Sequence, residues 1–203
     1  MKKYITEFIG TFFLVLTIGL TNGVNPLAIG AVLMVMIYAG GHISGGHYNP
    51  AVTLAVLIRK RISTSDALVY MGSQVAGGLI AALIVSVFRE DLPVEASQPL
   101  VISKAIIAEV LGTFALAYVV LNVATAKANA GNSYFGLAIG FTVMAMAYGL
   151  GQYSGGAFNP AVAVGASVMK MFEWSNIWIY VIGCFAGGAL AALVFKINNP
   201  EDK

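Results

Sequence analysis

The strongest constraint on the fold of this chain is an internal repeat. Residues 44–52 read Ser-Gly-Gly-His-Tyr-Asn-Pro-Ala-Val, and residues 154–162 read Ser-Gly-Gly-Ala-Phe-Asn-Pro-Ala-Val. A Glu-x-x-Gly-Thr-Phe motif precedes each segment, and Ala-Gly-Gly follows each one. Because the same motifs come in the same order, each half of the chain should fold as a copy of one structural unit.

Long apolar stretches separate these motifs. Of the 203 residues, 59% are hydrophobic and only 10% are charged, whereas soluble domains carry about a quarter charged residues. A helix that crosses a bilayer needs roughly 20 apolar residues. Six stretches are long enough, at 4–21, 27–43, 66–88, 102–123, 134–150 and 175–196. We expect an all-α membrane protein in a lipid bilayer, with a single transmembrane domain over 1–203, repeat one at about 1–88 and repeat two at about 102–196.

Each half contains three of these spans, and an odd number has a topological consequence. The second half enters the membrane from the side opposite to the first, so the halves should pair as inverted repeats, with the functional sites near the midplane. Eight of the 11 basic residues fall in the segments that six spans place on one side. Basic residues favour the cytoplasmic side. We therefore expect a multi-pass protein of the cell (inner) membrane with both termini in the cytoplasm.

Each Asn-Pro-Ala segment predicts the start of a short helix. Asn is a strong N-cap, and Pro fits the first helical position because its missing N–H is not needed there. Helices from Asn49 to about Ile58 and from Asn159 to about Met169 would reach ~15 Å, about half of the hydrocarbon core. The Gly-rich backbone before each one is tolerated at membrane depth only if it is buried in protein or lines a water-filled cavity. The pattern predicts a pore, although both segments could also cap re-entrant loops of a non-conducting protein.

These two segments, in their inverted repeat, resemble the major intrinsic protein (aquaporin) family, and the resemblance covers essentially the whole chain. It implies six tilted helices plus two re-entrant half-helices, assembled as a homotetramer with one pore per subunit. It also implies that the carbonyls of both Gly-rich loops, Gly155 included, line a pore for water or small neutral solutes. The pore motifs would be Asn49, Pro50, Ala51, Asn159, Pro160 and Ala161.

The expected mechanism depends on the two half-helix N-termini, which carry partial positive charge. An oxygen of a permeating molecule that accepts hydrogen bonds from both asparagine amides cannot also accept one from the next molecule in the file. This interrupts a proton wire, while the positive potential repels cations.

The outer constriction departs from the family pattern. Most members carry an arginine directly after the second Asn-Pro-Ala, where this chain has Val162. By spacing, the other three filter positions are Ile29, Ala147 and Gly156. Because all four are apolar or small, we expect a wide, weakly charged filter that passes glycerol-like polyols, urea, ammonia or metalloid acids such as arsenite. The alternative is a strict water channel, with Tyr148 or Phe158 narrowing the mouth.

Few other polar residues lie at membrane depth. Glu7 and Glu109 occupy equivalent apolar spans, and we expect them to accept hydrogen bonds from the re-entrant loops rather than to relay protons. His47 should brace the first loop, whereas the sequence leaves open whether His42 lines the inner half of the pore. Cys184, the only cysteine, is expected to be a small buried hydrophobic residue.

The remaining function classes are disfavoured. A secondary transporter with inverted repeats is the main alternative, but it would need midplane charges, for which only the two glutamates are candidates. No nucleophile–base pair, metal cluster or cofactor loop is recognisable, so we expect no catalytic residues, no metal and no cofactor. The net charge of +2 gives no reason to expect nucleic acid as a partner.

Overall fold

The structure, a computed structural model, describes residues 1–89 and 99–202. This part of the chain is helical and contains no strand. Its α-helices are α1 (Lys2–Leu20), α2 (Pro26–Ser44), α3 (Pro50–Ile58), α4 (Thr64–Phe88), α5 (Ile102–Val120), α6 (Phe135–Ser154), α7 (Pro160–Val168) and α8 (Ile177–Asn198). A π-helical turn, η1 (Leu121–Thr125), extends α5, and two 3₁₀ turns, η2 (Lys127–Asn129) and η3 (Trp174–Asn176), precede α6 and α8.

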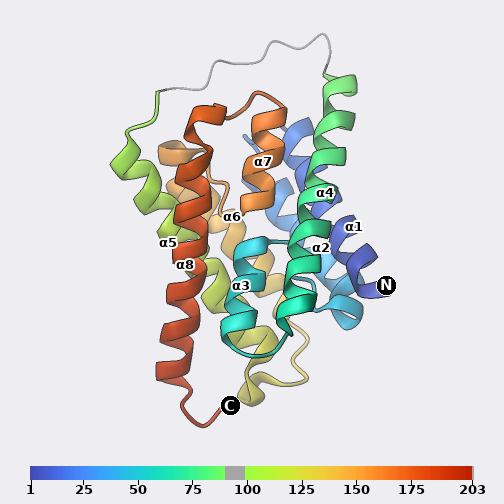
Figure 1. Cartoon of the computed structure of the whole chain (residues 1–203), viewed down its shortest axis with the longest axis vertical. Helices are drawn as coiled ribbons and strands as arrows, with labels where there is room; N and C mark the ends of the chain where they lie inside the picture. The colour runs from blue at the N-terminus through green and yellow to red at the C-terminus, as the bar shows by residue number, and fades with distance from the viewer. Residues whose placement is uncertain (90–98, 203) are drawn as a thin grey trace.

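Six of these helices are long and apolar enough to cross a membrane. They coincide with the six spans expected from the sequence, and α3 and α7 are the two expected half-helices, so the predicted fold class is confirmed. In Figure 1, α3 and α7 lie one above the other in the middle of the molecule, surrounded by the long helices. The half-helices are short because each begins at a proline and ends in an exposed left-handed lysine, Lys60 or Lys170, two residues beyond its last turn.

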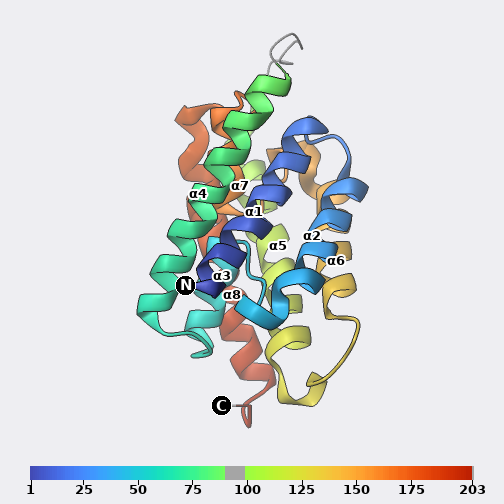
Figure 2. The ribbon, with the colours of Figure 1, turned by 90° about the vertical axis from the view of Figure 1, so that its right-hand side faces the viewer.

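The helices pair in the pattern that two similar halves would produce. Helix α1 packs on α4, and α5 packs on α8 in the same way. Helices α2 and α6 pack on each other, and Figure 2 shows them together at one side of the bundle. Each half-helix also packs on the last long helix of the other half, α3 on α8 and α7 on α4. The core is therefore shared by both halves.

The Ala-Gly-Gly motifs allow these close approaches. A Cβ at Gly78 in α4 would lie 2.9 Å from the carbonyl oxygen of Ala161 in α7. At the equivalent Gly188 in α8, a Cβ would lie 2.5 Å from the carbonyl oxygen of Ala51 in α3. Real Cβ atoms do not approach backbone atoms so closely, so only glycine lets the long helices of one half contact the half-helix of the other.

Candidate functional site

The site is built around the two half-helix starts. Asn49 is the N-cap of α3, and its Oδ1 accepts hydrogen bonds from the backbone N–H of Ala51 at 2.8 Å and of Val52 at 3.4 Å. Asn159 caps α7 through the equivalent bonds, at 2.9 Å and 3.4 Å. These bonds satisfy donors that the first turn of a helix leaves unpaired. Both asparagines are buried, with 3% of their surface exposed.

The same two asparagines also join the halves to each other. Asn49 donates from Nδ2 to the carbonyl oxygen of Phe158 at 2.8 Å, and Asn159 donates from Nδ2 to the carbonyl oxygen of Tyr48 at 2.9 Å. Tyr48 and Phe158 both have a φ of +47°, which is uncommon for bulky residues and stores strain. An amide group has two hydrogens, so each asparagine keeps one donor beyond this bond. The sequence did not reveal this reciprocal pairing.

Glu7 holds the loop that precedes α3. Its side chain is fully buried and accepts hydrogen bonds from Ser44 Oγ at 2.6 Å, the His47 N–H at 3.0 Å, the Tyr48 N–H at 2.7 Å and Gln74 Nε2 at 2.8 Å. Two of these donors are backbone groups of a loop that has no secondary structure to pair with. Glu7 therefore supplies hydrogen-bond partners that water would otherwise supply.

Glu109 holds the loop before α7 in nearly the same way. It accepts hydrogen bonds from Ser154 Oγ at 2.7 Å, the Ala157 N–H at 3.0 Å and the Phe158 N–H at 2.7 Å. The fourth donor is the thiol of Cys184, with Sγ 3.3 Å from Oε2. Cys184 is buried as expected, but it contributes this hydrogen bond in addition to packing.

A cavity of about 470 Å³ runs along the half-helix starts. One part of its lining comes from the re-entrant segments 46–49 and 155–159, which bring backbone polar groups and the two cap asparagines. Most of the other lining side chains are apolar and come from α1, α2, α5, α6 and the half-helices, with Asn22 and Gln152 as further polar residues. Among the described lining residues no side chain is an aspartate, glutamate, lysine or arginine. Such a cavity offers both hydrogen bonds and apolar surface, which suits small uncharged molecules.

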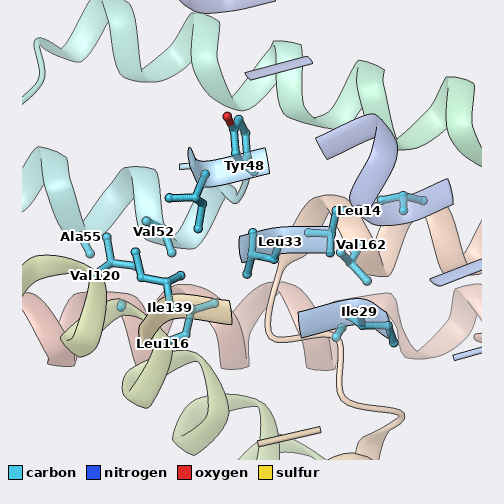
Figure 3. Close-up of a cluster of buried hydrophobic side chains, with 14 of the residues drawn as sticks. Leu14, Ile29, Leu33, Tyr48, Val52, Ala55, Leu116, Val120, Ile139 and Val162 are labelled. Carbon is cyan, nitrogen blue, oxygen red and sulfur yellow. The ribbon is translucent and has the colours of Figure 1, made fainter. Parts of the chain in front are cut away.

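The apolar side chains fall into two groups in the close-up view. Figure 3 shows Val162 and Ile29 in one group with Leu14 and Leu33. The second group contains Val52, Leu116, Val120 and Ile139. All eight line the cavity.

The structure brings together the four positions that the sequence assigned to the outer constriction. Ile29, Ala147, Gly156 and Val162 all line the cavity. Val162 lies in the first turn of α7 and is 4% exposed. Gly156 has a φ of +68°, a conformation that favours glycine. Gly155 also lines the cavity, with a φ of +86° at the end of α6.

The two histidines occupy different environments. His47 lines the cavity, and its Nδ1 lies 3.1 Å from Thr53 Oγ1. Its ring packs edge-on against Tyr70 at a centroid distance of 5.2 Å. His42 is exposed in the last turn of α2 and is not among the residues that line this cavity.

Sequence reasoning missed one hydrogen-bond donor in each half. Gln74 donates from Nε2 to Glu7 and to Thr53 Oγ1, at 2.8 Å and 2.9 Å. Gln74 and Cys184 both stand two residues before Ala-Gly-Gly, so they occupy equivalent positions in the repeat. A polar residue at that position in an apolar span was the available signal.

Comparisons with known proteins agree with this architecture. Residues 1–195 match the sequence model of the family described as "Major intrinsic protein". The chain is 35% identical to the "Glycerol uptake facilitator protein-like 6" of Lactiplantibacillus plantarum, over the whole of both proteins. It is 33% identical to the "Putative aquaporin NIP4-1" of Arabidopsis thaliana, covering all of this chain and 76% of the plant protein.

A solved structure also shares the fold. The X-ray structure of the aquaglyceroporin from Plasmodium falciparum superposes with a TM-score of 0.86 at 20% identity, covering 98% of this chain and 97% of the other. At this identity the likeness shows the fold alone. Together with the family match and the curated relatives, it places the chain in the major intrinsic protein family, as a multi-pass membrane channel for water, small solutes or both.

Proposed function

We propose that this channel passes small neutral solutes such as glycerol, urea, ammonia or undissociated arsenite, together with water, and that it is not an enzyme. The observation that carries the proposal is the uncharged lining of the cavity together with Val162 at the first turn of α7. A charged permeant would lose its hydration there without an ionic partner, whereas a polyol can face its hydroxyls to the backbone groups and its carbons to the apolar side.

We assign the outer filter to Ile29, Ala147, Gly156 and Val162. Two of the four present no side chain or only a methyl group, so the filter is wide. Val162 offers no hydrogen-bond donor, so the filter is also less positive than an arginine-bearing one. Rejection of cations then depends on the N-termini of α3 and α7, whose partial positive charges meet at Asn49 and Asn159.

In this proposal, only one of the two side-chain amide hydrogens of each asparagine takes part in the proton barrier. One amide hydrogen of Asn49 and one of Asn159 bond to the carbonyl of the opposite loop. The second hydrogen of each is assigned to the permeating oxygen. Because the first bond fixes the plane of the amide group, the second N–H bond points in a fixed direction. Pro50, Ala51, Pro160 and Ala161 set the caps, while Glu7, Glu109 and His47 hold the loops.

The orientation and assembly belong to the same proposal. We assign both termini to the cytoplasm and the protein to the cell (inner) membrane, as a homotetramer of one-domain subunits that each span 1–203. The cavity lies within one subunit, which supports one pore per chain. The C-terminal Asp202 bonds to Arg59 and to the Lys127 N–H, so the C-terminus lies with the segments where basic residues concentrate.

The strict water channel remains a second candidate because of one residue. Tyr148 lines the cavity and is 63% exposed, so the described chain leaves most of its side chain uncovered and a rotation toward the pore entrance would meet little packing within the subunit. Phe158 is not free in this way. It is 1% exposed, and its ring packs so closely on Gly112 that a Cβ there would collide with it.

The test is stopped-flow light scattering of purified protein in liposomes, with water, glycerol, urea and arsenite gradients run in parallel. Permeability of the wild type to glycerol or urea well above that of empty liposomes is expected. Permeability to water alone would favour the strict water channel, and no permeability to any solute would contradict the channel.

Two variants at one position test the filter assignment. Val162→Arg should lower glycerol and urea permeability about tenfold because it adds bulk and donors where pore diameter sets selectivity. Val162→Leu adds bulk without charge and should reduce both less. Unchanged rates in both variants would show that Val162 does not line the constriction.

A further inference from the structure

Helix α6 lines the cavity with side chains that shrink in one direction. Four residues at intervals of four positions line the cavity, namely Ile139, Val143, Ala147 and Gly151. Residues four apart lie on the same face of a helix, so these four form one continuous stripe. Along α6 the stripe loses carbon atoms at every turn and ends at a residue without a side chain. This stripe of α6 therefore leaves the most room at Gly151, while Tyr148 and Gln152 line the cavity beside it.

Space is open at the end of this stripe. A Cβ added to Gly151 would have no atom of the described chain within 4 Å outside its own helical surroundings. Gly155 and Gly156 are different, since both have positive φ and a Cβ at Gly155 would lie 2.5 Å from the Phe172 ring. Gly151 is thus the bare position in this part of the wall where a side chain fits and enters the cavity.

The equivalent glycine of the first half does not leave open space. Gly41 lies 110 positions before Gly151, in the matching turn of α2. A Cβ at Gly41 would meet the ring of Phe135 at 3.4 Å. At that distance the Phe135 ring would make van der Waals contact with the added carbon and cover it. Among the described residues no neighbour would cover a Cβ at Gly151 in this way, so contact with another helix does not account for this glycine.

We infer that Gly151 is a specificity-determining position that keeps the outer end of the pore wide enough for solutes larger than water. This rests on the proposed function and extends it. The four filter positions form the narrowest ring of the pore. Gly151 lies one helical turn beyond Ala147 and sets the width of the outer end of the pore, next to that ring. The solutes it admits are neutral molecules too broad for a single file of water, such as urea and glycerol.

The experiment compares Gly151→Ala, Gly151→Val and Gly151→Leu with Gly149→Leu in the liposome assay. Gly149 is the matched control because it lies on the same helix, is exposed, has open space around its Cβ and does not line the cavity. Replacing a glycine in the interior of a helix favours the helix. Loss of folding is therefore not the expected effect of either leucine.

Glycerol permeability should fall stepwise with side-chain size at position 151, by about tenfold for leucine, while water falls less than about twofold, because diameter selects against the larger solute. Gly149→Leu should match the wild type. Equal permeabilities of Gly151→Leu and Gly149→Leu for every solute would overturn the inference. A wild type that passes water alone would contradict the proposed wide filter and with it the role of Gly151 in admitting larger solutes. A wild type that passes glycerol, with Gly151→Leu equal to Gly149→Leu, would overturn the inference about Gly151 alone.

Discussion

The two halves hold their re-entrant loops with the same carboxylate but with different surroundings. Glu7 and Glu109 each accept one serine hydroxyl and two backbone N–H groups. The fourth donor is the amide of Gln74 in the first half and the thiol of Cys184 in the second. A thiol is a weaker donor than an amide.

The two halves also differ in the side chains that surround the donors to Glu7 and Glu109. In the first half, Gln74 and His47 both contact Thr53 Oγ1, which forms a connected polar network beneath α3. In the second half, alanines occupy the positions of His47 and Thr53. Each half also has a buried side-chain oxygen without a hydrogen-bond partner among the described residues, Gln74 Oε1 in the first half and Thr113 Oγ1 in the second. The shared bonds are what a re-entrant loop requires. The bonds present in only one half are free to differ, and the first half has more of them.

The largest expected effect is that of removing a carboxylate. Glu7→Ala leaves one buried and one partly buried backbone N–H unpaired, at about 2 kcal/mol each, which corresponds to a fall in Tm of about 10 °C for a chain of this size. Glu109→Ala should lower the Tm somewhat less, since it frees a thiol rather than the amide of Gln74. Thermal unfolding in detergent measures both, with the exposed Glu173→Ala as a control. A larger fall for Glu109→Ala would reverse the proposed order of the two halves.

The second comparison uses the glycines beneath the two aromatic residues. A Cβ at Gly10 would collide with the Tyr48 ring, and a Cβ at Gly112 would collide with the Phe158 ring. Tyr48 is also fixed by its hydroxyl, which donates to the Met36 carbonyl at 2.9 Å. Gly10→Ala should therefore cost about 3 kcal/mol and Gly112→Ala about 1–2 kcal/mol, within the range for overpacking.

The control for Gly10→Ala and Gly112→Ala is a glycine-to-alanine substitution that changes only helix propensity. Gly72 lies in α4 with nothing among the described residues within 4 Å of an added Cβ. Gly72→Ala should raise stability by about 0.5–1 kcal/mol. Equal unfolding midpoints for Gly10→Ala and Gly72→Ala would show that the Tyr48 ring moves aside at no cost.

The third comparison concerns the fourth donor. Gln74→Ala removes two hydrogen bonds, to Glu7 and to Thr53 Oγ1, worth about 2 kcal/mol together, whereas Cys184→Ala removes one weaker bond and should cost about 1 kcal/mol or less. The Tm values of the two variants measure the difference. A Cys184→Ala variant as unstable as Gln74→Ala would mean that the thiol bond contributes as much as the bonds of Gln74. The two halves would then hold their loops with equal strength at the fourth donor.

The sequence was sufficient for the elements and their caps, because those depend on local chemistry. Asn49-Pro50 and Asn159-Pro160 begin helices by capping and by the fixed φ of proline, and the six spans follow from length and apolarity. The reciprocal bonds from Asn49 to Phe158 and from Asn159 to Tyr48 join residues 109 and 111 positions apart. They depend on how the two halves dock, which no local pattern encodes. The Cys184 bond was also missed because a cysteine in an apolar span ordinarily only packs.

The smallest expected effect on stability comes from the contacts at the C-terminal ends of the two half-helices. At the end of α3, Arg59 is 4% exposed, stacks on Phe195 at 4.7 Å and donates to Asp202 at 2.6 Å. The equivalent position at the end of α7 is Met169, which packs without an ion pair. The first half-helix is therefore tied to the C-terminal segment and the second is not.

Acid should remove this tie between α3 and the C-terminal segment. The Lys127 N–H and the Arg59 guanidinium hold the pKa of the Asp202 carboxyl below its ordinary value of 3.8. A depressed pKa means that the carboxylate stabilises the folded state at neutral pH and that this contribution is lost as pH falls through the folded-state pKa. Asp202→Asn should lower the Tm slightly at pH 7, with the exposed Glu201→Gln as the control. The gap to the wild type should close below pH 3.8. A gap that persisted in acid would mean that the asparagine disturbs the α5–α6 connection by its shape, because a charge effect must disappear once the wild-type carboxyl is protonated.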